Sequence, residues 1–420
     1  MIICNGLFKV MCENRHYRKY HIDPYVNNKS LIRSNGRDAV TIPPYTRGIQ
    51  KMKSQEFIEQ LRQETGLSYI DVICKRKHKN VFRYTSGENA TGNEQLYMYS
   101  CSKVITVVAA LRLVEDGRLS LDDKVCKYLP EVENAFILEK NGEKQIVGQQ
   151  MTARHLFTMS AGFTYDLTTE PIQKLAEESR GTAVLRDFIP KFVQTPLSFV
   201  PGTRFQYSLC HDVLAAVVEV ITGLRFSAYV KEAVFDPLGM KNSHFDNSEE
   251  RSYDMFAASE TGEIRPDTQG KLLLPTKAYE SGGAGLASTV EDYSIFADAL
   301  ACAGQGQNGY QLIKKETLDL LCSKHFEGLD LNNGFTCVQG DDYNYGLGVR
   351  IRSKDTDWGL KTGEFGWDGA AGSYVMVDPN REISVFIGMN LLNWPAVFTG
   401  KHLQIVEQLY KEFFQNSSEI

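Results

Sequence analysis

Ser100 and Lys103 are the two residues whose types and spacing best suit nucleophilic catalysis in this sequence. Positions three apart in a helix share one face, so the amine of Lys103 can point at the hydroxyl of Ser100. A serine needs an adjacent base to become a nucleophile, and a lysine whose pKa is lowered by burial can be that base. A serine that caps a helix and a lysine that extends toward solvent would have the same spacing. The pair alone therefore leaves catalysis and capping as open interpretations.

The stretch after this pair has to position it. Residues 104–115 read VITVVAALRLVE, which is apolar almost all round and predicts a helix buried inside a domain. Gly117 follows, as expected where a helix ends in a left-handed residue. Ser100 would then lie at the start of a core helix. At that position, free backbone N–H groups and the positive end of the helix dipole would stabilise the serine alkoxide that attacks a substrate.

Length and charge limit the classes of protein to consider. A chain of 420 residues holds one large domain or about two to three smaller ones. The net charge of -6, with both signs mixed, argues against nucleic acid as the main partner. No apolar run reaches the roughly 18 residues that span a bilayer, so we expect no membrane span. The N-terminus does not resemble a signal peptide, and the location predicted by default is the cytoplasm.

Metal and disulfide motifs are not evident. The nine cysteines are scattered, and none forms a C-x-x-C pair. Without such spacing, or a His-Glu-x-x-His motif, the sequence predicts no metal site and no cofactor. Cys101 is a possible rival nucleophile, although a buried core residue is the plainer interpretation. We interpret His155 and His211 as structural hydrogen-bond partners or caps.

Predicted strands lie at both ends of the chain with helices between them. Residues 1–52 are basic and polar and are interpreted as an N-terminal extension, followed by one domain over 53–420. Because no βαβ alternation appears, we expect an α+β fold in which an antiparallel sheet is flanked by helices. The strands are predicted over 69–74, 81–87, 374–377 and 383–387, and the helices over 54–64, 152–157, 210–222, 227–235, 290–301 and 401–415.

Several longer motifs occur in a specific order: YMYSCSKVITVVAALRLVEDGRLSLDDKVCKYLPEV, MTARHLFTMSAGFTYD, PGTRFQYSLCHDVLAAVVEVITG, GGAGLASTVEDYSIFADAL and FGWDGAAGSYVMVDPN. Through these motifs, residues 54–415 resemble the serine β-lactamase and penicillin-binding-protein superfamily, nearest to its class C-like β-lactamase and esterase branch. The resemblance implies a β-lactamase/transpeptidase-like fold with a mostly helical subdomain. It also implies that Ser100 is the nucleophile, Lys103 its base partner, and Tyr207 the tyrosine of a Tyr-x-Asn motif that moves a proton to the leaving group.

The third motif of this superfamily has two candidates in the sequence. Lys361-Thr362-Gly363 matches by letter, whereas Trp367-Asp368-Gly369 matches by its position before the final hairpin. We prefer Trp367-Asp368-Gly369, because the small residues that follow allow a ligand to approach the backbone closely. The oxyanion hole would then consist of the backbone N–H groups of Ser100 and Ala370.

Two departures from the family pattern bear on the substrate. Leu209 stands where the asparagine of Tyr-x-Asn is expected, and Trp367-Asp368 replaces a basic and a hydroxyl residue. The site would lose the cation that holds a β-lactam carboxylate, and Asp368 would repel that group. With Trp367, Asp368, Gly369 and Leu209 as substrate-binding residues, we expect an uncharged, small-molecule ester or amide.

The expected function is thus a serine hydrolase that forms an acyl-enzyme on Ser100. A class C-type β-lactamase or DD-peptidase is the alternative within the enzymes. A non-catalytic binding module of the same fold is the alternative outside them, motivated by Leu209. The oligomeric state and the choice between hydrolysis and acyl transfer stay open.

Overall fold

The computed structural model describes residues 52–245, 254–259, 263–267, 274–325, 342–393 and 400–415. The interpretation of the first 52 residues as an extension falls almost wholly outside this part and stays a prediction.

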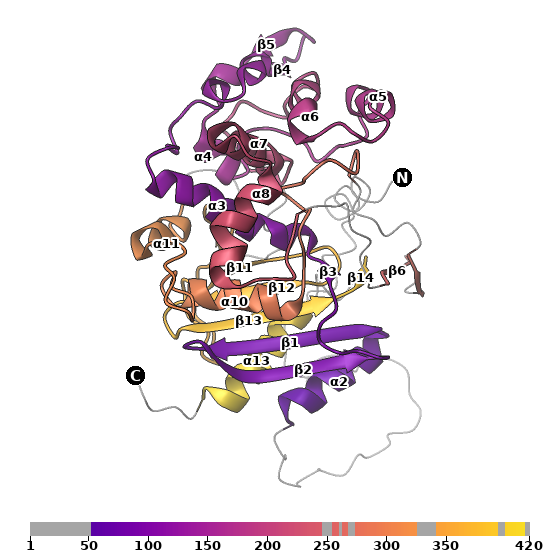
Figure 1. Cartoon of the computed structure of the whole chain (residues 1–420), viewed down its shortest axis with the longest axis vertical. Coiled ribbons are helices and arrows are strands. Elements are labelled where there is room, and N and C mark those ends of the chain that lie inside the picture. Colours follow the sequence, from indigo (N-terminus) through magenta and orange to yellow (C-terminus); the bar gives the residue numbers. More distant parts are fainter. Residues whose placement is uncertain are drawn as a thin grey trace, which may run out of the picture.

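A seven-stranded sheet joins the two ends of the described chain (Figure 1). All its neighbouring strands are antiparallel, in the order β2-β1-β13-β12-β11-β10-β9. The N-terminal strand β1 pairs with the late strand β13, so that Ile70 lies opposite Met389. The strands are β1 (Tyr69–Arg76), β2 (Lys79–Gly87), β9 (Tyr343–Tyr345), β10 (Arg350–Arg352), β11 (Phe365–Asp368), β12 (Tyr374–Asp378) and β13 (Ile383–Met389). The predicted α+β architecture is confirmed.

The turn between β1 and β2 is tighter than predicted. The predicted strands left residues 75–80 between them. In the structure β1 and β2 both extend into this stretch, and only Lys77 and His78 remain between them. These residues have positive φ angles of 51° and 65°. Positive φ at both central positions is the turn geometry that matches the twist of a two-residue hairpin.

Helices cover both faces of the sheet. Side chains alternate between the faces of a strand, and β1 accordingly sends Ile70 and Val72 into one core and Tyr69 and Ile73 into the other. The first core is closed by α2 (Ser54–Thr65) and α13 (Lys401–Phe413), and the second by α3 (Ser102–Glu115) and α10 (Val290–Ala301). The apolar helix after Ser100 therefore lies in the larger core, as its composition predicts.

A mostly helical region lies above the sheet in Figure 1. It contains α4 (Ala153–Phe157), α5 (Glu170–Glu178), α6 (Leu185–Phe192), α7 (Cys210–Thr222) and α8 (Phe226–Val230). The single helix predicted over 227–235 is instead α8, a π-helical turn (Lys231–Phe235) and α9 (Asp236–Leu238). The π-helical turn could not be predicted, because the spacing of apolar residues does not reveal one extra residue in a single turn.

Shorter elements complete the described chain. They are the pairs β3 (Leu96–Tyr97) with β8 (Ala287–Ser288) and β4 (Phe136–Leu138) with β5 (Lys144–Ile146), the small sheet of β6 (Phe256–Ala258), β7 (Ile264–Pro266) and β14 (Leu391–Leu392), the helix α11 (Lys315–Leu321), and the 3₁₀ turns Tyr99–Cys101, Val125–Lys127, Pro130–Asn134 and Gly148–Gln150.

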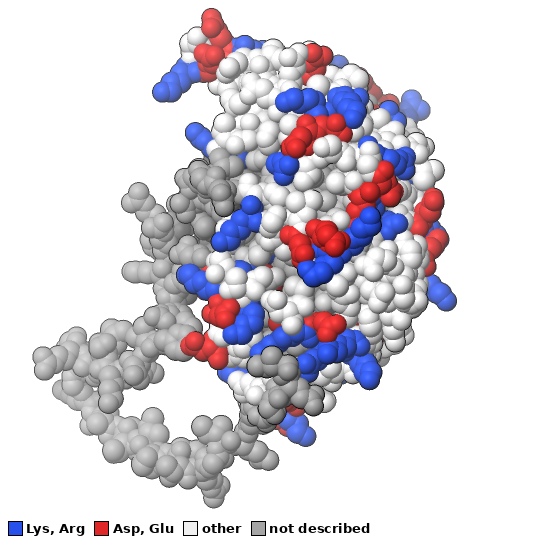
Figure 2. All heavy atoms as spheres, turned by 90° about the vertical axis from the view of Figure 1, so that its left-hand side faces the viewer, with Lys and Arg blue, Asp and Glu red and all other residues white. Residues whose placement is uncertain are grey.

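The surface carries both signs of charge. Figure 2 shows basic and acidic side chains interspersed over the face that it displays. Among the described residues, no single helix is long and apolar enough to cross a membrane. The bent pair Cys210–Thr222 and Phe226–Leu238 meets the length and composition only when the two helices are taken together.

Candidate active site

Ser100 lies on the 3₁₀ turn Tyr99–Cys101, directly before α3. The turn is closed by the N–H of Cys101, which donates to the carbonyl of Met98 at 3.1 Å. Tyr99 has a positive φ of 44°, a conformation that a bulky L-residue adopts only where its surroundings enforce it. Such local strain is typical of functional sites, and here it presents the neighbouring hydroxyl at the start of a buried helix.

The amine of Lys103 reaches the Ser100 hydroxyl. Lys103 is fully buried, and its Nζ lies 3.2 Å from the Oγ of Ser100. The same amine donates to the carbonyl of Gly283 at 2.6 Å and lies 3.4 Å from the hydroxyl of Tyr165. Because an amine has a limited number of hydrogen-bonding directions, these two contacts direct the remaining one at Ser100. The i, i+3 geometry expected from the sequence is present.

A buried carboxylate shapes the segment that holds Lys103. Asp212 on α7 accepts hydrogen bonds from the hydroxyls of Tyr279 at 3.1 Å and Ser281 at 2.6 Å. A Cβ on Gly283 would lie 2.6 Å from the Oδ2 of Asp212 and 3.4 Å from the Nζ of Lys103. Burial raises the pKa of Asp212, and the nearby Lys103 acts in the opposite direction. Only glycine fits between this carboxylate and the amine.

Tyr207 lies beside the Ser100 and Lys103 pair. Its hydroxyl accepts a hydrogen bond from the indole N–H of Trp367 at 3.3 Å, and its ring centroid lies 4.6 Å from the Nζ of Lys103. Burial raises the pKa of Tyr207 well above its usual value, although hydrogen bonds with Ser100 and Trp367 oppose this shift. The phenol is therefore protonated at neutral pH and is suited to donate a proton rather than to accept one.

Three aromatic rings are stacked along this side of the site. Tyr207 is sandwiched between Tyr165 and Trp367, with ring centroids 5.6 Å apart in both pairs and interplanar angles of 15° and 18°. Sequence reasoning did not single out Tyr165, although it lies in the motif MTARHLFTMSAGFTYD, because it is one of 20 tyrosines and its contact with Lys103 is made over 62 residues of chain. Its hydroxyl at Lys103 and its ring on Tyr207 make it a further part of the site.

The turn from β11 to β12 brings backbone N–H groups to the Ser100 turn. A Cβ on Gly369 would lie 2.4 Å from the carbonyl oxygen of Met98, so the two turns touch through a position that admits only glycine. Ala370 follows and is exposed. In the part of the chain that the structure describes, the amide of Ala370 makes no backbone hydrogen bond.

Trp367 and Asp368 face opposite sides of β11. Trp367 contacts Tyr207, whereas Asp368 accepts a hydrogen bond from the buried guanidinium of Arg350 at 3.1 Å. Arg350 also lies 3.4 Å from the carboxylate of Glu364. The Asp368 side chain is thus paired within the sheet, and its charge is not left free to repel a substrate as the sequence led us to expect. The backbone of Asp368, and not its side chain, is therefore the part that could contact a substrate.

The two candidates for the third motif occupy different surroundings. Lys361 pairs with Asp355 at 2.8 Å with about half of each side chain exposed, and the Thr362 hydroxyl bonds the same carboxylate. Lys361-Thr362-Gly363 is therefore an exposed turn. Trp367, in contrast, lies against Tyr207. The geometry favours Trp367-Asp368-Gly369 as the motif that borders the site.

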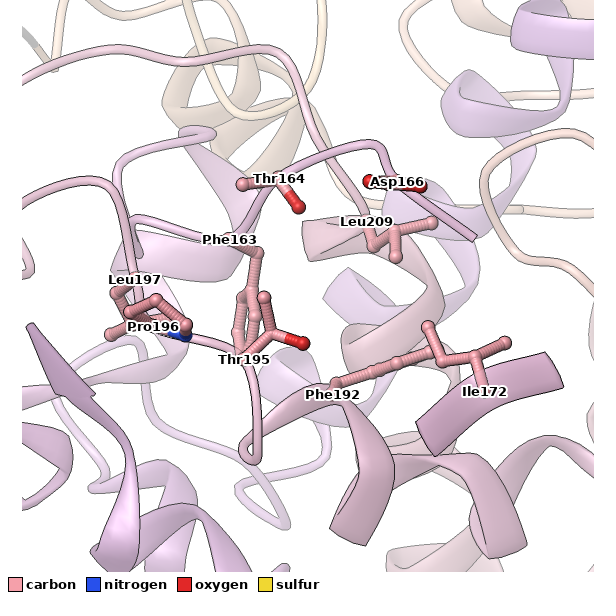
Figure 3. A pocket seen from close by; sticks show the side chains of 9 residues that line it. All are labelled: Phe163, Thr164, Asp166, Ile172, Phe192, Thr195, Pro196, Leu197 and Leu209. Atoms are coloured by element: carbon pink, nitrogen blue, oxygen red, sulfur yellow. The ribbon is translucent and has the colours of Figure 1, made fainter. Parts of the chain in front are cut away.

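Leu209 lines a small hollow beside the site (Figure 3). The hollow has room for no more than about one water molecule, and Leu209 is buried within its wall. The N–H of Leu209 donates to the carbonyl of Thr164 at 3.2 Å, which joins the wall to the segment that carries Tyr165. The other lining residues are largely apolar: Phe163, Thr164, Asp166, Ile172, Phe192, Thr195, Pro196 and Leu197.

The remaining residues singled out in the sequence have structural surroundings. Burial raises the pKa of the Cys101 thiol to about 12, so that this thiol does not compete with Ser100 as a nucleophile. His155 accepts a hydrogen bond from the N–H of Thr152 in a capping box at the start of α4. His211 is buried in α7 and contacts the carbonyl of Phe157 at 3.3 Å. Both histidines are structural partners, as interpreted.

Comparison with known proteins agrees with this fold. A family model described as Beta-lactamase matches residues 55–410. Esterase EstB of Burkholderia gladioli is 33% identical over 265 residues, which cover 56% of this chain and 66% of that protein. The solved structure of EstCE1, a hydrolase with promiscuous acyltransferase activity, has a TM-score of 0.70 at 23% identity and covers 85% of this chain and 97% of its own. Unliganded simvastatin synthase LovD from Aspergillus terreus has a TM-score of 0.66 at 19% identity, with 86% and 99% covered. Because the family model spans most of its length, this chain belongs to the β-lactamase family.

Proposed function

We propose that this protein is a serine hydrolase that cleaves an uncharged ester or amide through an acyl-enzyme on Ser100. The observation that carries the proposal is the 3.2 Å contact between the buried amine of Lys103 and the Ser100 hydroxyl, with the Tyr207 phenol alongside. A nucleophile, a base within hydrogen-bond reach and a group that orients the base are the parts that covalent catalysis needs.

The reaction begins when Lys103 takes the proton of Ser100 as its oxygen attacks the substrate carbonyl. The N–H groups of Ser100 and Ala370 stabilise the resulting oxyanion, usually the largest electrostatic contribution to acyl transfer. Tyr207, which keeps its proton at neutral pH, donates it to the departing alcohol or amine. Lys103 then returns the proton to the phenol, and water or another acceptor releases the acyl group.

The surroundings of Ser100 favour an uncharged substrate. Trp367 and Tyr207 offer aromatic surface where a cation would be needed to hold a carboxylate, and the nearby Arg350 is already engaged by Asp368 and Glu364. The names of the relatives point the same way, since they include an esterase and a hydrolase with acyltransferase activity. An ester is therefore the first substrate class to test.

Replacement of Ser100 by alanine tests the nucleophile. Ser100→Ala should abolish turnover of a p-nitrophenyl ester and labelling by a fluorophosphonate probe, while Cys101→Ala, beside it in the chain, should keep both. Intact mass after brief mixing should show one acyl group, mapped to Ser100. Labelling that survives in Ser100→Ala would disprove the assignment. Rapid nitrocefin hydrolysis would favour the β-lactamase alternative, and a single acyl burst without turnover would favour a binding module.

A further inference from the structure

A second cluster of chemically active side chains lies between the β1–β2 turn and the end of α10, outside the serine site. His78, Asp298 and Cys302 each offer one ligand atom, and these three atoms all lie within 4.8 Å of one another. The Nδ1 of His78 is 2.7 Å from the Oδ2 of Asp298, and the Sγ of Cys302 is 4.0 Å from its Oδ1. An imidazole, a carboxylate and a thiol in one place are three of the ligand types that zinc prefers.

The backbone holds the three ligands in place. Asp298 and Cys302 are four residues apart at the end of α10 and so share a helix face. His78 lies in the tight hairpin turn with a φ of 65°, and its own N–H donates to the Oδ1 of Asp298 at 3.2 Å. The ring is therefore directed at the carboxylate by a fixed backbone and not by a flexible loop.

The electrostatics of this place favour a cation. Asp298 is a buried carboxylate, 4% exposed, in the last turn of α10, where the helix dipole is already negative. A negative side chain at that end is unfavourable unless a positive charge faces it. His78, 26% exposed, is the member of the pair that reaches solvent.

We propose that His78, Asp298 and Cys302 bind a divalent transition metal, zinc in the first place, with water in a fourth position. Zinc bonds of about 2.0–2.3 Å place tetrahedral ligand atoms about 3.3–3.8 Å apart. The His78 and Asp298 atoms would separate slightly as the ion replaces the proton between them, and the thiol would lose its proton to solvent. The metal would join the edge hairpin to α10 and stabilise the folded chain. Sequence spacing could not reveal this site, because 220 residues separate His78 from Asp298.

Cobalt and zinc titrations of the full chain test the proposal. After treatment with a chelator and a reductant, the wild-type protein should bind one equivalent of cobalt with a thiolate-to-metal charge-transfer band, and zinc should displace it. Cys302→Ser should lose the band, and His78→Gln should weaken binding at least about tenfold. Zinc should also raise the melting temperature of the wild type and not of these variants.

Cys322→Ser is the matched control, because Cys322 also follows a helix but lies outside the cluster. It should bind metal as the wild type does. Ester hydrolysis by every variant reports that the fold is intact. Wild-type protein that binds no metal, or equal binding by the wild type, Cys302→Ser and His78→Gln, would overturn the proposal, the latter result placing the ion on other thiols of the chain.

Discussion

Replacement of Trp367 by phenylalanine isolates the hydrogen bond that the proposed proton donor receives. Phenylalanine keeps an aromatic ring against Tyr207 but removes the indole N–H that reaches its hydroxyl at 3.3 Å. The phenol oxygen gains negative charge as its proton passes to the leaving group. The lost hydrogen bond therefore matters more in the transition state than in the resting enzyme.

The size of the effect follows from the charge on the phenol oxygen. A hydrogen bond to a neutral group contributes about 0.5–1.5 kcal/mol, and one to a charged group about 1.5–3 kcal/mol. At about 1.4 kcal/mol per factor of ten, Trp367→Phe should lower kcat/KM by about 10- to 150-fold if charge develops on Tyr207. The loss should be larger for an alkyl ester than for a p-nitrophenyl ester, because the poorer leaving group depends more on protonation.

The assay compares kcat/KM for the two esters in Trp367→Phe and in Trp358→Phe. Trp358 is the matched control, since it packs edge-on against Tyr410 in the opposite core. Its replacement should change kcat/KM less than about twofold. Equal losses for both esters in Trp367→Phe, or no loss beyond that of the control, would refute the assignment of Tyr207 as the proton donor.

Three further predictions follow from the same contacts. Gly283→Ala would place a methyl group 2.6 Å from the Oδ2 of Asp212 and displace the carbonyl that accepts from Lys103, the proposed base, so ester turnover should fall at least about 100-fold while circular dichroism stays unchanged. Arg350→Met should lower the free energy of unfolding in urea by about 3–5 kcal/mol, because it removes the guanidinium that pairs with Asp368 and leaves the buried Glu364 carboxylate with only Arg352 as a cation; an unchanged urea midpoint would contradict this. Burial lowers the pKa of His155 to about 4, so the unfolded chain binds more protons than the folded one between pH 6.5 and 4, and stability should fall by about 3 kcal/mol as the pH drops through that window, but not in His155→Gln.

Elements with a strong local signal could be predicted from the sequence. The helix expected over 210–222 is α7 with the same bounds, because an apolar run ends at Gly223, which adopts a left-handed φ of 76°. The helix over 290–301 is capped by Thr289, whose side chain accepts from the N–H of Asp292. In both cases the residues that end the helix act through neighbours in the chain, so local sequence suffices.

Strands β9 and β10 could not be predicted in the same way. Each has three residues, and β10 buries two arginines, Arg350 and Arg352. Such a strand has neither the length nor the apolar alternation that marks one in a sequence. Its stability comes from pairing with β11 and from ion pairs with Glu364, which lies 14 residues away from Arg350. The structure of β10 therefore depends on its contacts with β11 and Glu364 more than on its own sequence.

The same distinction separates the predicted from the missed residues of the site. Ser100 and Lys103 are one helical turn apart, and their contact follows from helix geometry. Tyr165 and Gly283 reach the same amine from 62 and 180 residues away. Tyr207 and Trp367 were placed only through the resemblance to a known superfamily. The local half of the site is thus a property of the sequence pattern, and the other half is a property of the fold.

These long-range contacts also bear on Leu209, the departure that raised the possibility of a non-catalytic protein. An asparagine at this position would offer Lys103 an amide oxygen, and leucine cannot. The amine is nevertheless held by the carbonyl of Gly283 at 2.6 Å and faces the hydroxyl of Tyr165 at 3.4 Å. With leucine in place of the asparagine, the amine of Lys103 is still directed at Ser100, and the side chain at position 209 is apolar and buried. Leu209 therefore does not by itself favour a non-catalytic protein, because the contacts that direct Lys103 at Ser100 do not depend on it.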